Sequence, residues 1–328
     1  MKFGIGALRA LCVAAASALL VSCGGEDLVP FSPARLLVFG DQASVIVVGA
    51  SPADGRKYTI NYADDTTGAV DCGRNPIWVQ VVALAYDISF PECPFPAGAV
   101  VVGQIRAIDG AQAGGTRDID LTAQITRQLE LPEASGGGIQ STDLVTVFAG
   151  VNDIVAAYER YKAGGSFEQA TADVEAAGET LAAQVNRIAA AGGKVIIATT
   201  PDVGVTPYAR AQAADDSARL TFLTGRLNAR LLVTINNNGR EIGLIELNPY
   251  LISVVANPLA YGYLDVTSAA CVPPDPLVPL DLLLCTTKTL QPDATSYNWL
   301  WAGATQLSPG GHAQLGSLAV SRASNQPF

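Results

Sequence analysis

"LLVFGDQASVIVVG", residues 36–49, is the stretch that decides the fold. Its apolar run breaks at Gly40-Asp41, which predicts a buried strand that leaves its sheet in a sharp turn. In an α/β sheet, the turn after the first strand is a favoured place for a nucleophile or a ligand-binding loop. Gln42 stands at the tip of this turn, and an amide is not a nucleophile. The stretch therefore predicts an α/β protein whose chemistry is in question.

Buried strands alternate with amphipathic helices along the rest of the chain. Strands are predicted at 144–149, 194–199 and 242–248, with an excursion strand at 57–62. Helices are predicted at 76–85, at 118–129, after Gly150, from the capping box at Ser166 to Gly192, and around 220–231. This alternation predicts a parallel sheet that is covered on both faces by helices.

The N-terminus has the pattern of an export signal. Lys2 and Arg9 precede an apolar stretch from Ala10 to Leu20, which is the plan of an export signal and not of an anchor helix. The signal ends in Leu-Val-Ser-Cys, which resembles the lipobox of bacterial lipoproteins. We therefore expect Cys23 to be acylated and to hold the protein on a membrane; the glycine after it favours the outer membrane in that pattern. Residues 23–35 would form a tether, and residues 36–328 one folded domain.

The remaining cysteines suit an oxidising compartment. Cys12 leaves with the signal, and Cys72, Cys93, Cys271 and Cys285 remain beside the lipidated Cys23. Of the three possible pairings we predict Cys72–Cys93 and Cys271–Cys285, because each closes a local loop worth about 3 kcal/mol. The sequence has neither a CxxC motif nor a Cys/His cluster, so we expect no metal and no cofactor.

Composition limits the classes of partner. With 49% hydrophobic and 15% charged residues, the 328-residue chain can bury a large core. Loss of the signal leaves 18 basic and 30 acidic residues, a net charge of −12. The sequence has no basic patch that would bind nucleic acid, so this class of partner is excluded.

Three blocks carry a family resemblance. "VFGDQAS" contains Phe39-Gly40-Asp41, "AGGTRDIDLTAQI" places a glycine before a helix with Asp118 and Gln124, and "AGVND" contains Asn152. In this order they resemble the SGNH/GDSL hydrolases, which are serine esterases and lipases. The resemblance covers nearly all of the mature chain. It implies a three-layer α/β/α fold with a flavodoxin-like parallel sheet.

The same resemblance implies positions for the catalytic machinery. Gly114, with Gly110 as the fallback, would supply the backbone N–H of an oxyanion hole, and Asn152 would supply its side-chain donor. The triad is not there. Gln42 replaces the nucleophilic serine. In "WAGATQLSPGGH", Gly303 and Gln306 replace the aspartate and the histidine. None of the three substitutes can do the work of the residue it replaces.

Other residues offer an alternative set. Ser44 and Ser308 are hydroxyls near the blocks, and His312, the one histidine of the chain, lies in a helix that begins at Pro309. Two of these residues also have an ordinary structural interpretation: Ser44 caps or packs the turn, and His312 packs its helix against the sheet. Asn152 and Asp153 could likewise cap the helix that follows their strand, independent of catalysis.

These observations lead to two hypotheses. The first is a lipoprotein of the cell envelope with a lost triad, acting as a binding or scaffolding domain for an ester, lipid or glycan ligand. The second is a working ester hydrolase that uses Ser44 or Ser308 with His312. They differ on whether a hydroxyl lies within hydrogen-bond reach of His312 at an open cavity.

Overall fold

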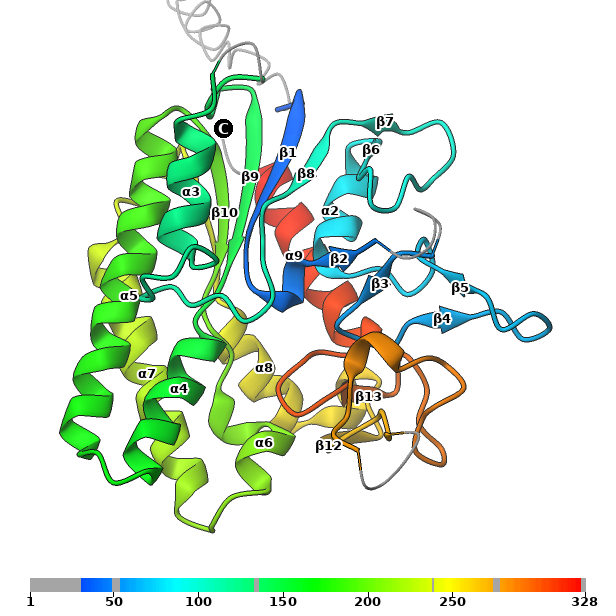
Figure 1. Cartoon of the computed structure of the whole chain (residues 1–328), viewed down its shortest axis with the longest axis vertical. Coiled ribbons are helices and arrows are strands. Elements are labelled where there is room, and N and C mark those ends of the chain that lie inside the picture. The colour runs from blue at the N-terminus through cyan, green and yellow to red at the C-terminus, as the bar shows by residue number, and fades with distance from the viewer. Residues whose placement is uncertain (1–30, 49–53, 133–135, 238, 274–277, 326–328) are drawn as a thin grey trace, which may run out of the picture.

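A five-stranded parallel sheet forms the centre of the molecule (Figure 1). The computed structural model describes residues 31–48, 54–132, 136–237, 239–273 and 278–325. Within them the strands lie in the order β8 (Gly103–Ile105), β1 (Arg35–Gly40), β9 (Asp143–Phe148), β10 (Lys194–Ala198) and β11 (Ile242–Ile245). β8, the second of these strands in chain order, lies at the edge of the sheet beside β1. On the other side of β1, the strands β9, β10 and β11 follow in chain order. This is the flavodoxin-like order, as predicted.

Helices cover both faces of the sheet because side chains of β1 alternate between them. Leu37 and Phe39 pack in one apolar cluster, and Leu36 and Val38 pack in the other. The first cluster is covered by α3 (Leu121–Leu129), α4 (Val151–Lys162), α5 (Phe167–Ala190) and α7 (Asp216–Thr234). The second is covered by α2 (Trp78–Ala85), α8 (Leu247–Ala256) and α9 (Pro309–Asn325). Figure 1 shows α3 and α5 to the left of the sheet, with α2 and α9 to its right.

The longest helix follows from its local sequence. The Ser166 hydroxyl accepts the N–H of Gln169 at 3.0 Å, as the capping box predicts, and the helix stops before Gly192, whose φ is +99°. Its apolar side chains at helical spacing are buried against the sheet and α7.

Two predicted strands are shorter than expected. In the 57–62 segment only the last residue of β3 (Arg56–Lys57) and the first residue of β4 (Tyr62–Ala63) belong to strands. The Asn61 side chain interrupts the predicted strand because it bonds to the backbone of Lys57. Its Oδ1 accepts the Lys57 N–H at 2.9 Å, and its Nδ2 donates to the Lys57 carbonyl at 3.0 Å. The 242–248 strand ends at Ile245, and α8 begins at Leu247.

Short strands and two disulfides organise the connections. Small two-stranded sheets pair β2 (Ile46–Val47) with β3, β4 with β5 (Val70–Asp71), β6 (Ile88–Ser89) with β7 (Val100–Val101), and β12 (Asp265–Ala269) with β13 (Trp299–Trp301); α6 (Pro207–Arg210) is a single turn. Both predicted disulfides, Cys72–Cys93 and Cys271–Cys285, are present, with Cα–Cα distances of 5.8 and 5.9 Å.

The predicted signal segment, residues 1–22, and Cys23 lie outside the described residues. In the described part of the chain, no helix combines the length and the apolar character needed to cross a membrane.

Candidate functional site

The turn after β1 is fixed by its neighbours. Gly40 has a φ of +135°, and a Cβ there would lie 2.0 Å from the Phe148 carbonyl oxygen, so only glycine fits. The Gln124 amide accepts the Gly40 N–H at 3.0 Å and donates to the Gly40 carbonyl at 2.9 Å. Asp41 accepts the Ala43 N–H at 3.0 Å and closes a short 3₁₀ turn. The side chain of Gln42 is thereby held in one place.

The Gln42 amide occupies a pair of converging donors. Its Oε1 accepts a hydrogen bond from Asn152 Nδ2 at 2.9 Å and another from the Gly110 N–H at 3.3 Å. Its Nε2 donates to Asn152 Oδ1 at 3.1 Å. One backbone N–H and one side-chain amide on a single carbonyl-type oxygen is the arrangement of an oxyanion hole. Here the oxygen belongs to the protein itself.

The structure places the fallback glycine, Gly110, at this position instead of Gly114. The Gly114 N–H donates to Asp153 Oδ1 at 2.8 Å, and the Ala113 N–H donates to Asp153 Oδ2 at 2.8 Å. Of the two candidate glycines, the one whose backbone N–H bonds to Gln42 is therefore Gly110. A Cβ at Gly114 would lie 2.9 Å from the Ala177 Cα, so glycine is needed there for close packing on α5.

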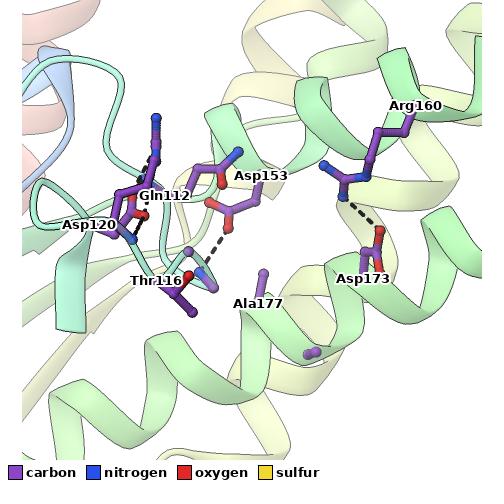
Figure 2. A pocket seen from close by; sticks show the side chains of 11 residues that line it. Gln112, Thr116, Asp120, Asp153, Arg160, Asp173 and Ala177 are labelled. Atoms are coloured by element: carbon purple, nitrogen blue, oxygen red, sulfur yellow. Dashed lines mark hydrogen bonds and ion pairs between the residues drawn. The ribbon is translucent and has the colours of Figure 1, made fainter. Parts of the chain in front are cut away.

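Gly114 and Asp153 face a separate cavity of about 450 Å³ (Figure 2). Arg160 and Asp173 form an ion pair at 2.6 Å between α4 and α5 on its wall. Burial is the main cause that raises the pKa of Asp153 to about 6, and the two backbone N–H groups oppose that rise. This carboxyl holds the 110–120 loop onto α4.

Asn152 and Asp153 do not cap their own helix. The N-cap of α4 is Gly150, which has no side chain to offer. Asn152 Nδ2 instead donates to the Ala111 carbonyl at 2.8 Å as well as to Gln42. The prediction of an ordinary capping role was wrong for both, because Asp153 binds the 110–120 loop, and Asn152 binds that loop and Gln42 in the turn after β1.

Gln42 and Gln306 meet at one cavity of about 300 Å³, named here the Gln42 cavity. Its wall also contains the residues Tyr58, Asp109, Asp281 and Leu282. Gly303 lies behind Gln306: a Cβ on it would come within 2.7 Å of both Gln306 Oε1 and Leu282 Cδ1. The three positions that the resemblance assigns to the triad thus gather in one region of the fold.

The polar wall of the Gln42 cavity is acidic. Tyr58 donates its hydroxyl to Asp109 Oδ2 at 2.9 Å. Burial, together with Asp109 and Asp281, raises the pKa of Tyr58 above its ordinary value, so the phenol stays protonated. Sequence reasoning missed these three residues. They lie in segments between the family blocks and come together only through the fold.

His312 is buried, and no hydroxyl of the described residues is hydrogen-bonded to its ring. It is 1% exposed, its Nδ1 accepts the Trp78 N–H at 3.4 Å, and its Nε2 has no hydrogen-bond partner among the described residues. Burial lowers the pKa of His312 to about 3, with a smaller contribution from the charge of Lys57, so the ring is neutral.

Ser44 and Ser308 are fully buried and engaged elsewhere. The Ser44 hydroxyl accepts the indole N–H of Trp78 at 3.0 Å, and that of Ser308 accepts the Gly311 N–H at 3.3 Å. Ser44 and His312 thus have structural contacts of the kind that the sequence also suggested, and Ser308 is bonded to the first turn of α9. The structure does not bring them together at an open cavity, as the alternative set would require.

No cluster of His, Cys, Asp or Glu in the described ranges could hold a metal ion.

A comparison with protein families gives a match. The family model "GDSL-like Lipase/Acylhydrolase" matches residues 45–272, which is more than half of the chain. The match begins after Gln42 and ends before Gly303, so the three positions that the resemblance assigns to the triad lie outside it. A search of curated proteins gave no match.

Solved structures with a similar chain include an acetylxylan esterase. Axe2 from Geobacillus stearothermophilus is 13% identical, with a TM-score of 0.43, over 92% of this chain and 99% of its own. Two catalytic mutants of the same enzyme are each 15% identical over the same shares, with TM-scores of 0.43 and 0.44. The match of the family model establishes that this chain belongs to the GDSL-like lipase/acylhydrolase family.

Proposed function

We propose that this chain is a catalytically impaired member of its family, which binds a ligand in the Gln42 cavity and does not cleave an ester. The Gln42 amide carries the proposal. Its oxygen takes the hydrogen bonds of Gly110 and Asn152, the two donors that would otherwise stabilise an oxyanion. The residue in the nucleophile position therefore blocks the donors as well as lacking a hydroxyl.

The absence of a base supports the same proposal. Acyl transfer by a serine needs a histidine to take its proton and a carboxylate to orient that histidine. Gln306 is an amide and Gly303 has no side chain. His312 is buried and neutral, with no hydroxyl bonded to it. The alternative hypothesis of a relocated hydrolase thus has no geometric support.

A hydroxyl-rich ligand such as a glycan fits the cavity best among the ester, lipid and glycan classes. The carboxylates of Asp109 and Asp281 and the amide of Gln306 offer acceptors for sugar hydroxyls, and Tyr58 offers an aromatic ring. The apolar part of the wall is formed by Leu280, Leu282 and Ala304.

We further propose that the domain works at the cell envelope, anchored through lipid on Cys23. The lipobox-like segment at the end of the predicted signal supports this placement. Cys23→Ser should move the protein from the membrane fraction to the soluble fraction, with an unchanged fold by circular dichroism. A variant that stays with the outer membrane would contradict lipidation.

The impaired activity is tested with short p-nitrophenyl esters. We expect the purified protein to give no turnover above the buffer blank. Thermal-shift screening with acetylated and free oligosaccharides should find a ligand whose stabilisation is lost in Asp281→Ala. Ester turnover that disappears in His312→Ala but survives in Gln42→Ala would refute the proposal and establish the relocated hydrolase.

A further inference from the structure

A second cavity, named here the Arg106 cavity, lies at the edge of the sheet. It has a volume of about 330 Å³ between the end of the edge strand β8 and helix α3. Its wall includes two cations, Arg106 and Arg127, the buried amide of Gln128, and the apolar side chains of Ile105, Ile108 and Leu131. Gln124 also lines it, and this residue holds Gly40 by two hydrogen bonds. The Arg106 cavity is therefore distinct from the Gln42 cavity and adjoins the same turn.

Both arginines lack an ion-pair partner in the described part of the chain. Arg106 donates its Nε to Gln128 Oε1 at 2.9 Å and its Nη2 to Gln104 Oε1 at 2.7 Å. Arg127 donates its Nη1 to the Asp118 carbonyl at 2.7 Å. All these acceptors are neutral. The charge of Arg106 acts on the Glu92 carboxyl, but burial raises the pKa of Glu92. The two side chains do not form an ion pair.

Gln128 provides a second, independent observation. It is 1% exposed, and Arg106 fixes its orientation by occupying its Oε1. Its Nε2 has no hydrogen-bond partner among the described residues. A buried donor without an acceptor costs stability, so such a group calls for a missing acceptor. Two cations and an unmatched N–H group on the wall of one cavity call for an anion.

We propose that the Arg106 cavity binds a carboxylate that carries an apolar body, such as a medium-chain fatty acid. The carboxylate oxygens would take the guanidinium groups of Arg106 and Arg127 and the Nε2 of Gln128. The chain would lie on Ile105, Ile108 and Leu131. In a protein of net charge −10, two cations without carboxylate partners on one apolar wall select this ligand from neutral lipids and sugars.

The test is calorimetric titration of the full protein with octanoate, with octanamide as the uncharged match and inorganic phosphate as the anion without an apolar body. We expect octanoate to bind at least about tenfold more tightly than either, and about tenfold more weakly to Arg106→Gln or Arg127→Gln. Arg226→Gln is the matched control, because Arg226 pairs with Glu175 elsewhere.

Gln128→Glu keeps the test decisive if the arginine variants fail to fold. The substitution keeps the shape of the side chain and places a carboxylate beside Arg106, so octanoate binding should disappear while the melting temperature holds or rises. Equal binding of octanoate and octanamide, phosphate binding as tight as octanoate binding, unchanged octanoate binding in Gln128→Glu, or equal weakening in Arg226→Gln would each overturn the proposal.

Discussion

The region to which the family resemblance assigns the active site has two halves that differ. On one side, Gly110 and Asn152 converge as hydrogen-bond donors, and their acceptor is Gln42. On the other, Gly303 has no side chain, and its neighbours Leu282 and Gln306 close around the space that a side chain would need. The donor groups also build the loop and helix contacts of the fold, so losing them would cost stability. A histidine base and the carboxylate that orients it would not have such additional structural contacts.

Restoring the triad should produce the largest effect. The triple change Gln42→Ser, Gly303→Asp, Gln306→His frees the two donors and supplies a nucleophile with its base. We expect p-nitrophenyl acetate turnover roughly 100-fold above that of the unmodified protein. Gln42→Ser alone should stay inactive, because a serine without a base is a weak nucleophile.

Recovery of turnover will be partial because other side chains occupy the space next to Gly303. An aspartate at position 303 has to displace the end of the Leu282 side chain, which would lie 2.7 Å from its Cβ. Displacements near 1 Å can cost about 100-fold in rate. A triple variant that folds but has no turnover would show that the aspartate and histidine introduced at positions 303 and 306 cannot form a working base. High activity of Gln42→Ser alone would show that another residue acts as the base.

A buried carboxyl next to Gln42 should make stability depend on pH. Burial is the main cause that raises the pKa of Asp41 from 3.8 to about 7. Between these values the folded protein keeps a proton that the unfolded chain releases, so this contribution to stability is complete below pH 4 and is lost as pH rises to 7. The free energy of unfolding of the unmodified protein should therefore fall by up to roughly 4 kcal/mol between pH 4 and 7, and Asp41→Asn should abolish this fall.

Urea unfolding of both proteins from pH 4 to 8 measures this difference. Asp65→Asn, which alters an exposed carboxyl, is the control and should leave the pH profile unchanged. Parallel pH profiles for the unmodified protein and Asp41→Asn would show that Asp41 is ionised in the folded state.

The hydrogen bonds between Gln42 and Asn152 should give a smaller, measurable coupling. Their two side chains exchange two hydrogen bonds, at 2.9 and 3.1 Å. In a double-mutant cycle of Gln42→Ala and Asn152→Ala, we expect a coupling free energy of about 1–2 kcal/mol by urea unfolding. The pair Gln42→Ala and Asn228→Ala should be additive, since Asn228 binds Thr200 elsewhere. Additivity in both pairs would mean that Gln42 does not satisfy the donors.

The smallest effect is expected at His312. In the triple variant, His312→Gln should change turnover by less than about twofold, because the ring is buried and no hydroxyl bonds to it. Steady-state kinetics of the two variants side by side measure this ratio. A large loss of rate would show that His312 acts as the base and that the two halves of the site are not independent.

The fold could be predicted from the sequence because its signals are local. The strand before Gly40, the Ser166 cap and the apolar spacing of α5 each depend on residues within a few turns of each other. The two disulfides were also predictable, because each joins cysteines only 21 or 14 residues apart.

The site was less predictable because its contacts span long separations. Gly110 and Gly114 both precede α3, and only the path of the loop decides which one reaches Gln42, 68 residues away. Asn61 interrupted a predicted strand through bonds to Lys57 that strand periodicity does not encode. The carboxyls of Asp109 and Asp281 reach Tyr58 from distant segments, so no motif announces them.

The Gln42 amide also acts as a tethered competitor. A ligand carbonyl that approaches Gly110 and Asn152 must replace an oxygen already fixed there by the backbone of the turn. Tethering gives such a group an effective concentration of at least about millimolar, far above that of most free metabolites. The Gln42 oxygen therefore weakens the binding of a ligand carbonyl to these two donors. The selectivity of the cavity then depends on the wall formed by Tyr58, Asp109 and Asp281.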